Sequence, residues 1–273
     1  MVFKILFFIF LLTPQAFSQG FDLTNKNDGK EIEITAEDSI EWQQNEKVVI
    51  ANGKAKAVRG NVTLNADILK AFYDVNENNK NDIYMVNGDG NIVIKNLNET
   101  AYGNSIVYDI KQGVMILNGK PAKTITKGNT LTANIFEYWQ NKKMAVAREN
   151  AKVVKDDGKT VTAKTMTAHF KEGRDKNLEV QYIDAFDDVV FTGESEKIYA
   201  KRARYNLETM IIRLEGDIKI ERNKNILTGA YATVNMKTGI SKLYSKGKEK
   251  VKGVFIPEYK DNKKQENKQK VED

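Results

Sequence analysis

The chain has no cysteine, only 3 prolines and a single histidine among its 273 residues. Without thiols it has neither a disulfide framework nor thiol-based catalysis. The single histidine, His169, cannot form a metal cluster by itself, so we expect neither a metal nor a cofactor. The scarcity of proline leaves long strands uninterrupted, because proline removes a hydrogen-bond donor from a sheet.

Several motifs that carry chemistry are also missing. In GVMILNGKP a proline follows the lysine where a phosphate loop needs Ser or Thr. DVNENNKNDIYM begins like a calcium loop at Asp74 but has Asn79 in place of the glycine and Met85 in place of the glutamate. Basic residues do not cluster with aromatic ones, so nucleic acid is not an expected partner. Carboxylates concentrate at turns among lysines, which is typical of a solvated sheet and not of an enzyme, although a paired-acid hydrolase stays open.

The N-terminal apolar run is too short for a membrane span. Ile5 to Phe17 is 13 residues, against about 20 for a bilayer. A cation precedes the run and the small residues Ala16 and Ser18 follow, which predicts a signal peptide over 1–18 and a mature chain from about Gln19. An uncleaved anchor is the alternative. Export without disulfides favours a bacterial periplasm.

A strand motif recurs along the chain. A polar turn, one Ala or Gly and an alternating apolar run appear in NVTLNADILKAFYD (61–74) and again in NTLTANIFEYW (129–139). We call the Ala or Gly the anchor residue. The anchors are Ala36, Ala66, Gly103, Ala133, Ala163, Ala200 and Gly229, with spacings of 30, 37, 30, 30, 37 and 29 residues. A near-constant period of this size indicates a repeat architecture.

A second strand lies between successive anchors, joined by short polar turns such as TKGN and QNKK. Short turns between long strands predict antiparallel neighbours. The fold class is therefore all-β, with about seven two-stranded repeats and roughly 14 strands. Residues 19–30 are expected to be flexible, and the basic tail 258–273 is expected to be disordered because it holds too few apolar residues to pack.

Glycines occupy the middle of several second strands, at Asn52-Gly53, Asn87-Gly88, Asn118-Gly119 and Glu215-Gly216. Asn-Gly commonly forms hairpin turns, but turns here would leave pieces of about four residues. We therefore interpret these sites as bulges within strands, with true turns as the alternative. Pro121 follows one of these sites, and its missing backbone N–H is consistent with an interruption of the hydrogen bonds between strands there.

Apolar residues fall three and five places after each anchor, with mostly polar residues between them. A period of two gives each strand one buried and one solvated face. The inward positions are Ile106, Tyr108, Phe136, Tyr138, Met166, Ala168, Ala203, Tyr205, Ala232 and Val234. The intervening, solvated positions are Glu137, Thr167, Arg204 and Thr233.

Three segments resemble the OstA-like repeat of the periplasmic lipopolysaccharide-transport proteins, the family of LptA. They are IEITAEDSIEW, VVIANGKAKAVRGNVTLNADILKAFYD and MILNGKPAKTITKGNTLTANIFEYW. Ala66-Asp67 and Ala133-Asn134 match the family's Ala-Asp/Asn element, and KVKGVFIPE resembles its closing strand. In later repeats the pair changes to Ala163-Lys164, Ala200-Lys201 and Gly229-Ala230, and the chain is longer than a typical single-domain member.

The resemblance implies an open, V-shaped antiparallel β-jellyroll over 31–257, with a division into two halves near 140–150 left open. It also implies a periplasmic bridge that carries lipopolysaccharide from the inner to the outer membrane through an apolar groove. Its implied partners are LptC-like inner-membrane and LptD-like outer-membrane components, with head-to-tail self-association by edge-strand pairing. The expected lipid-binding groove residues are Ile34, Ile106, Tyr108, Phe136, Tyr138, Met166, Tyr205 and Val234.

Two other classes of protein stay open. An exported structural or adhesive β-repeat protein would use the same residues only for core packing. A carbohydrate-active enzyme would need a cleft with two close carboxylates.

Overall fold

The computed structural model describes residues 32–75, 81–174, 178–247 and 250–256, and all regular structure in these ranges is β-strand. The strands are β1 (Glu33–Thr35), β2 (Ser39–Gln43), β3 (Val48–Arg59), β4 (Val62–Val75), β5 (Asn81–Lys95), β6 (Glu99–Asp109), β7 (Val114–Thr126), β8 (Asn129–Trp139), β9 (Met144–Lys155), β10 (Thr160–Glu172), β11 (Leu178–Thr192), β12 (Glu196–Asn206), β13 (Ile211–Arg222), β14 (Asn225–Asn235), β15 (Ile240–Tyr244) and β16 (Lys252–Val254). The expected signal peptide, flexible N-terminus and basic tail lie outside these ranges, as do residues 76–80 of the calcium-like segment. No helix in the described ranges is long and apolar enough to cross a membrane.

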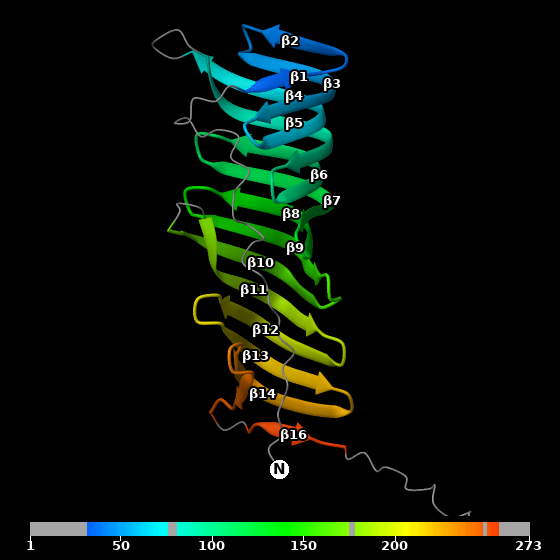
Figure 1. Ribbon diagram of the computed structural model, residues 1–273, viewed down its shortest axis with the longest axis vertical. Helices are drawn as coiled ribbons and strands as arrows, with labels where there is room; N and C mark the ends of the chain where they lie inside the picture. The colour runs from blue at the N-terminus through cyan, green and yellow to red at the C-terminus, as the bar shows by residue number, and fades with distance from the viewer. Residues whose placement is uncertain (1–31, 76–80, 175–177, 248–249, 257–273) are drawn as a thin grey trace, which may run out of the picture.

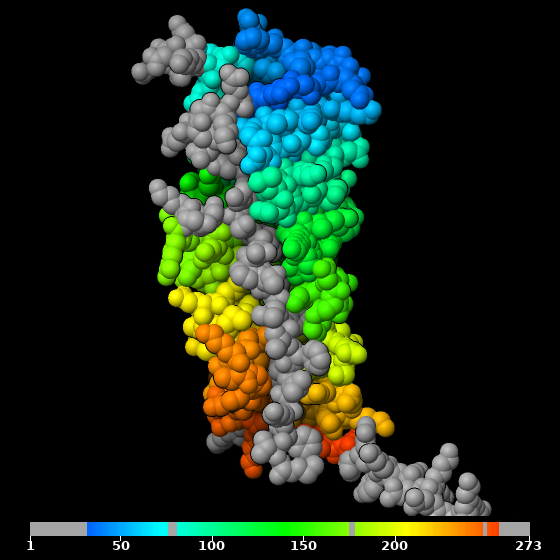
Figure 2. Space-filling model, viewed as in Figure 1, coloured from blue at the N-terminus to red at the C-terminus, as the bar shows by residue number. Residues whose placement is uncertain are grey.

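The strands form one antiparallel meander. Each strand from β3 to β14 pairs with the next along the chain, β1 and β2 both pair with β3, and β16 pairs with β14. The result is an elongated stack with the N-terminal strands at one end and the C-terminal strands at the other (Figures 1 and 2). The prediction of an all-β, open antiparallel fold is confirmed.

The strand count is 16 and not 14, because the first and last strands are each divided. β1 and β2 pair with successive stretches of β3, separated by three residues that include the anchor Ala36. β15 and β16 likewise share the free side of β14. The sequence pattern treated each pair as one strand, because an edge strand can break without disturbing the alternation of its neighbours.

Bulges interrupt the long strands near their middle. The register shifts at Asn52/Ala55, at Asn118/Ala122 and at Glu215/Ile218, which confirms three of the four predicted bulges. The prediction for Asn87-Gly88 was wrong, because that bulge lies two residues later, at Gly90 and Asn91 with φ of 75° and 45°. Gly88 instead permits close packing, since a Cβ there would lie 2.8 Å from the Ile106 side chain.

Each bulge lies beside an anchor residue. The first residue after the bulge in β3 is Ala55, which pairs with Ala66, and the equivalent residue of β5 is Ile92, which pairs with Gly103. A Cβ on Gly103 would lie 2.7 Å from the carbonyl oxygen of Asn118. Small anchor residues and local bulges together let the strands bend over the interior.

The anchors show a longer period. Ala36, Ala66 and Gly103 have counterparts 97 residues later at Ala133, Ala163 and Ala200. We call β1–β7 the N-terminal unit and β8–β13 the C-terminal unit. The remaining strands, β14 to β16, extend the sheet beyond β13. Counterparts below are matched by this period and by strand register, with a shift of 96 or 97 residues.

The change from Ala-Asp to Ala-Lys in the later repeats has a structural partner. In the N-terminal unit, Asn91 Nδ2 in the β5 bulge donates to Asp67 Oδ2 at 2.9 Å. In the C-terminal unit the counterparts are Lys164 and Asp188, and Lys164 Nζ lies 3.1 Å from Asp188 Oδ2 in the β11 bulge. The acidic residue lies on the anchor strand in the N-terminal unit and in the bulge in the C-terminal unit. The side-chain contact between anchor strand and bulge is therefore kept, with donor and acceptor exchanged.

The interior holds two large apolar clusters, one in each unit. Phe136 in β8 packs against both of them. Because the sheet continues from β7 to β8 without interruption, the two interiors form one continuous apolar column.

Candidate functional site

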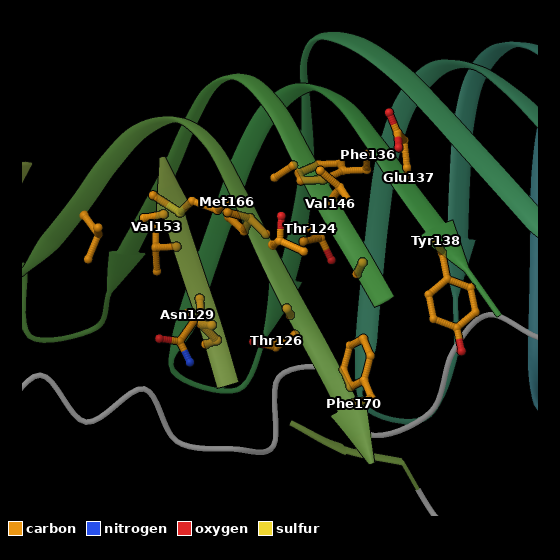
Figure 3. A pocket seen from close by; sticks show the side chains of 18 of the residues that line it. Thr124, Thr126, Asn129, Phe136, Glu137, Tyr138, Val146, Val153, Met166 and Phe170 are labelled. Carbon is orange, nitrogen blue, oxygen red and sulfur yellow. The ribbon is translucent and has the colours of Figure 1, made fainter. Parts of the chain in front are cut away.

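An apolar cavity lies where the two units meet. It has a volume of about 150 Å³ and is lined by residues of β6 to β13. Arching strands carry Phe136, Val146, Val153 and Met166 into it (Figure 3). Alternation brings every second residue of these strands to the same face, and the bulges bend both ends of each strand around the space.

Aromatic side chains form part of the cavity lining. Tyr138 and Phe170 both line it, with their ring centroids 6.4 Å apart in an edge-to-face arrangement. Tyr205 lines it from β12. Aromatic rings give a large apolar contact area with few rotatable bonds, which suits a site for a flexible hydrocarbon chain.

Polar residues occupy one part of the lining, at the start of β6, the end of β7 and the start of β8. The Thr124 hydroxyl donates to Glu99 Oε1 at 2.5 Å. Burial raises the pKa of the Glu99 carboxyl to about 7, and the hydrogen bond from Thr124, which favours the ionised form, opposes this rise. Thr126 and Asn129 complete this part of the lining.

A smaller cavity of about 30 Å³ lies within the N-terminal unit. Its residues Leu69, Ala71 and Val86 are the counterparts of Met166, Ala168 and Ile183, which line the larger cavity. The two cavities therefore occupy the same place in the repeat.

The structure places the eight predicted groove residues in three environments. Phe136, Tyr138, Met166 and Tyr205 line the large cavity, and Ile34 lines the small one. Ile106, Tyr108 and Val234 are buried in the apolar clusters. The inward orientation of the set is confirmed, while contact with a lipid stays a prediction.

The solvated face was predicted less well. Thr167 is only 8% exposed, and both Thr167 and Glu137 line the large cavity. The register partners of Thr167, Val146 and Asp184, are buried as well. This stretch of β10 therefore lacks the wet face that its alternation suggested.

Sequence reasoning missed most of the lining from the second strands. Met115, Leu117, Val146, Ile183 and Ile212 line the cavity from β7, β9, β11 and β13. These strands also alternate between apolar and polar residues. The inward positions were predicted only at three and five places after an anchor residue, so the second strands were left out. Glu99, Thr124 and Asn129 were missed because turn-adjacent polar residues resemble a solvated rim.

The single histidine has local partners. His169 stacks on Tyr182 with centroids 4.2 Å apart, and its Nε2 lies 3.6 Å from Asp184 Oδ2. Burial lowers the pKa of His169, with Arg204 adding to this effect and Asp184 opposing it. In the part of the chain that the structure describes, no group of three or more His, Cys, Asp or Glu side chains could hold a metal ion.

Comparison with known proteins identifies a family. The model of LptA and LptD N-terminal domain lipopolysaccharide transport proteins matches residues 33–139 and again 130–240. No curated protein matches the chain. Among solved structures, the chain is similar to LptH, the LptA homologous periplasmic component of the lipopolysaccharide transport device of Pseudomonas aeruginosa. The two are 14% identical, the match covers 84% of this chain and 96% of that one, and the TM-score is 0.20. Because the family model covers most of residues 33–240, the chain belongs to the LptA/LptD N-terminal domain family of lipopolysaccharide transport proteins.

Proposed function

We propose that this protein is a periplasmic bridge that carries lipopolysaccharide between the inner and outer membranes, with the acyl chains held in the cavity between its two units. The observation that supports this most directly is the apolar lining shared by eight consecutive strands, β6 to β13. Burial of hydrocarbon gains about 25 cal/mol per Å². The cavity can therefore hold acyl chains by burial alone, with no covalent chemistry, and we propose no enzymatic activity.

The N-terminal edge of the sheet supports the bridge. Ile40 and Trp42 on β2 are 53% and 59% exposed. Their counterparts, Phe136 and Tyr138 on β8, are covered because β7 precedes β8 in the sheet. A strand from another molecule, added beside β1 and β2 as β7 is added beside β8, would cover Ile40 and Trp42 in the same way.

The C-terminal edge is also apolar. Val254, Phe255 and Ile256 are 44%, 60% and 51% exposed. Apolar residues at both ends fit head-to-tail association with a second copy, or with LptC-like and LptD-like components. Export by the predicted signal peptide, with the mature chain starting near Gln19, belongs to the same proposal, as does the division of the jellyroll into two units.

Site-specific photo-crosslinking in cells tests the proposal. A photoreactive phenylalanine analogue replaces Phe136 in the cavity and, separately, Asn141 in the turn after β8, where the side chain is exposed. We expect a lipopolysaccharide adduct at position 136 and none at 141. Equal labelling, or no adduct at 136 or the neighbouring cavity positions, would favour an exported structural β-repeat protein.

A further inference from the structure

The polar part of the cavity lining is a row in register across three neighbouring strands. Glu99 in β6 pairs with Thr126 in β7, and Thr126 pairs with Asn129 in β8. In Figure 3, Asn129 and Thr126 lie near the ends of their strands, while Val146 and Met166 lie deeper among the arches. The row thus borders a space whose other lining residues are mostly apolar.

The hydrogen bonds of this row are incomplete within the described residues. Thr124 uses its hydroxyl proton on Glu99 Oε1. Asn129 is 7% exposed, and its Oδ1 is buried with no hydrogen-bond partner among the described residues. Thr126 Oγ1 is likewise buried with no hydrogen-bond partner among the described residues. Buried polar atoms in native proteins nearly always have a partner, from the protein, water or a ligand.

The counterparts of this row in the other repeats are arranged differently. Asn225, the counterpart of Asn129, accepts a hydrogen bond from the Ile256 backbone N–H at 3.0 Å. The counterpart of Thr126 is Arg222, a cation that pairs in register with Glu196. In the N-terminal unit the position of Asn129 is held by an apolar residue, Ile32. Of the three positions, only the one between the units presents an unpartnered buried amide oxygen.

We infer that Glu99, Thr126 and Asn129 form a subsite for a hydroxyl group carried on the hydrocarbon chain that enters the cavity. Asn129 Oδ1 and the Glu99 carboxyl are acceptors, so they select a ligand that donates a proton. The Thr126 hydroxyl can donate in return, and a hydroxyl group both donates and accepts. A phosphate is disfavoured, because the site offers acceptors and a carboxyl group and no described cation pairs in register with Glu99.

The inference rests on the proposed function, since it concerns the chain that the cavity takes up. Its test uses two esters that differ by one hydroxyl, methyl tetradecanoate and methyl 3-hydroxytetradecanoate. Each competes with the polarity-sensitive dye 1-N-phenylnaphthylamine for the purified full-length mature protein. We expect the wild-type protein to prefer the hydroxylated ester by about fivefold, the usual effect of one buried hydrogen bond.

Variants identify the residues that create this preference. Asn129→Ile, which introduces the type of side chain found at the counterpart Ile32, should bring the ratio of the two affinities to about one. Thr126→Val should lower the ratio as well, and it replaces Asn129→Ile if that variant does not fold. Asn134→Ile is the matched control, because Asn134 lies on the same strand but donates to Glu149 outside the cavity; it should keep the fivefold preference.

The outcomes separate the two proposals. Equal binding of both esters to the wild-type protein would overturn the subsite and leave the lipid-binding cavity intact. A preference that survives both Asn129→Ile and Thr126→Val would overturn it too. If neither ester displaces the dye, the cavity does not take up hydrocarbon chains and both proposals fail.

Discussion

The N-terminal and C-terminal units share a plan of bulges, anchors and strand register, yet their cavities differ in volume by a factor of five, about 30 Å³ against about 150 Å³. The walls built by β3 to β5 and by β9 to β11 use corresponding positions. The difference in cavity volume comes from the strands that precede each wall in the sheet. The C-terminal unit follows β6 and β7 of the N-terminal unit, which contribute Ala101, Met115 and Leu117 to its cavity, whereas the N-terminal unit begins at a free edge.

This comparison shows that the large cavity is produced by joining two units rather than by either unit alone. Trp42 and Tyr73 form an edge-to-face pair at 6.4 Å, as their counterparts Tyr138 and Phe170 do. The second pair lines a cavity and the first lies at an exposed edge. Docking of another sheet on that edge would therefore extend the apolar column.

The largest expected effect concerns the carboxyl groups of the two units. Burial raises the pKa of Glu99 from 4.5 to about 7. Between these values the folded protein binds more protons than the unfolded chain, so the stability present below pH 4.5 is lost as pH rises through 7. Glu99→Gln should remove this loss, which reaches as much as about 3 kcal/mol above pH 7.

Urea unfolding at about pH 4 and about pH 8 measures the effect. The counterpart variant Glu196→Gln should flatten the pH dependence less, because burial raises the pKa of Glu196 while Arg222 opposes the rise. Parallel stability curves for Glu99→Gln and the wild-type protein would contradict the account of Glu99.

The next effect tests the difference in cavity volume. Ala51 lines the small cavity, and its counterpart Ala147 lines the large one between Phe136 and Met166. Ala51→Phe should cost about 2 kcal/mol of the free energy of unfolding through overpacking, whereas Ala147→Phe should cost about 1 kcal/mol or less. Chemical denaturation measures both. Equal losses would mean that the two sites have equal room.

A third effect tests the free edge against the joined one. Ile40→Lys places a charge where the counterpart Phe136 is covered by β7, and it should weaken the proposed self-association by about tenfold or more. Leu97→Lys is the control, because Leu97 is 70% exposed in the turn between β5 and β6, away from the edge. Sedimentation velocity measures association, and unchanged association of Ile40→Lys would exclude this edge as the contact.

The smallest effect tests the bulges. Glu149 has a φ of 60° in the β9 bulge, where its β3 counterpart is Gly53 with a φ of 80°. Glu149→Gly should stabilise the protein by about 1 kcal/mol, because only glycine adopts this conformation without strain. Gly53→Glu should destabilise it, since a Cβ there would lie 2.3 Å from Asp38 Oδ2. Thermal unfolding measures both, and the same sign for the two changes would refute the equivalence of the bulges.

The sequence was sufficient to predict the repeat, the antiparallel meander and the inward positions on the anchor strands. Alternation and anchor spacing are local properties, and they predicted the burial of Tyr108 and Val234 correctly. The position of the β5 bulge was not predictable from Asn87-Gly88, because Gly88 and Gly90 offer the same backbone freedom. Packing against Ile106 decides between them.

The cavity between the units was beyond local reasoning for a different reason. Its volume depends on residues from eight strands, among them Leu117 and Phe191, which meet only after the sheet has bent. Its polar row combines Glu99 with Asn129, and each of them alone looks like an ordinary turn-adjacent polar residue. Only register places them in one row.

The native methionines offer the most direct test of the cavity as a lipid site. Met115 and Met166 line it, whereas Met236 is buried in the C-terminal apolar cluster away from the lining. Methyl NMR of the protein labelled with carbon-13 at methionine methyl groups follows all three during titration with purified lipopolysaccharide. The account predicts that the Met115 and Met166 signals shift or broaden and that the Met236 signal stays in place. Unchanged Met115 and Met166 signals at saturating lipopolysaccharide would contradict it.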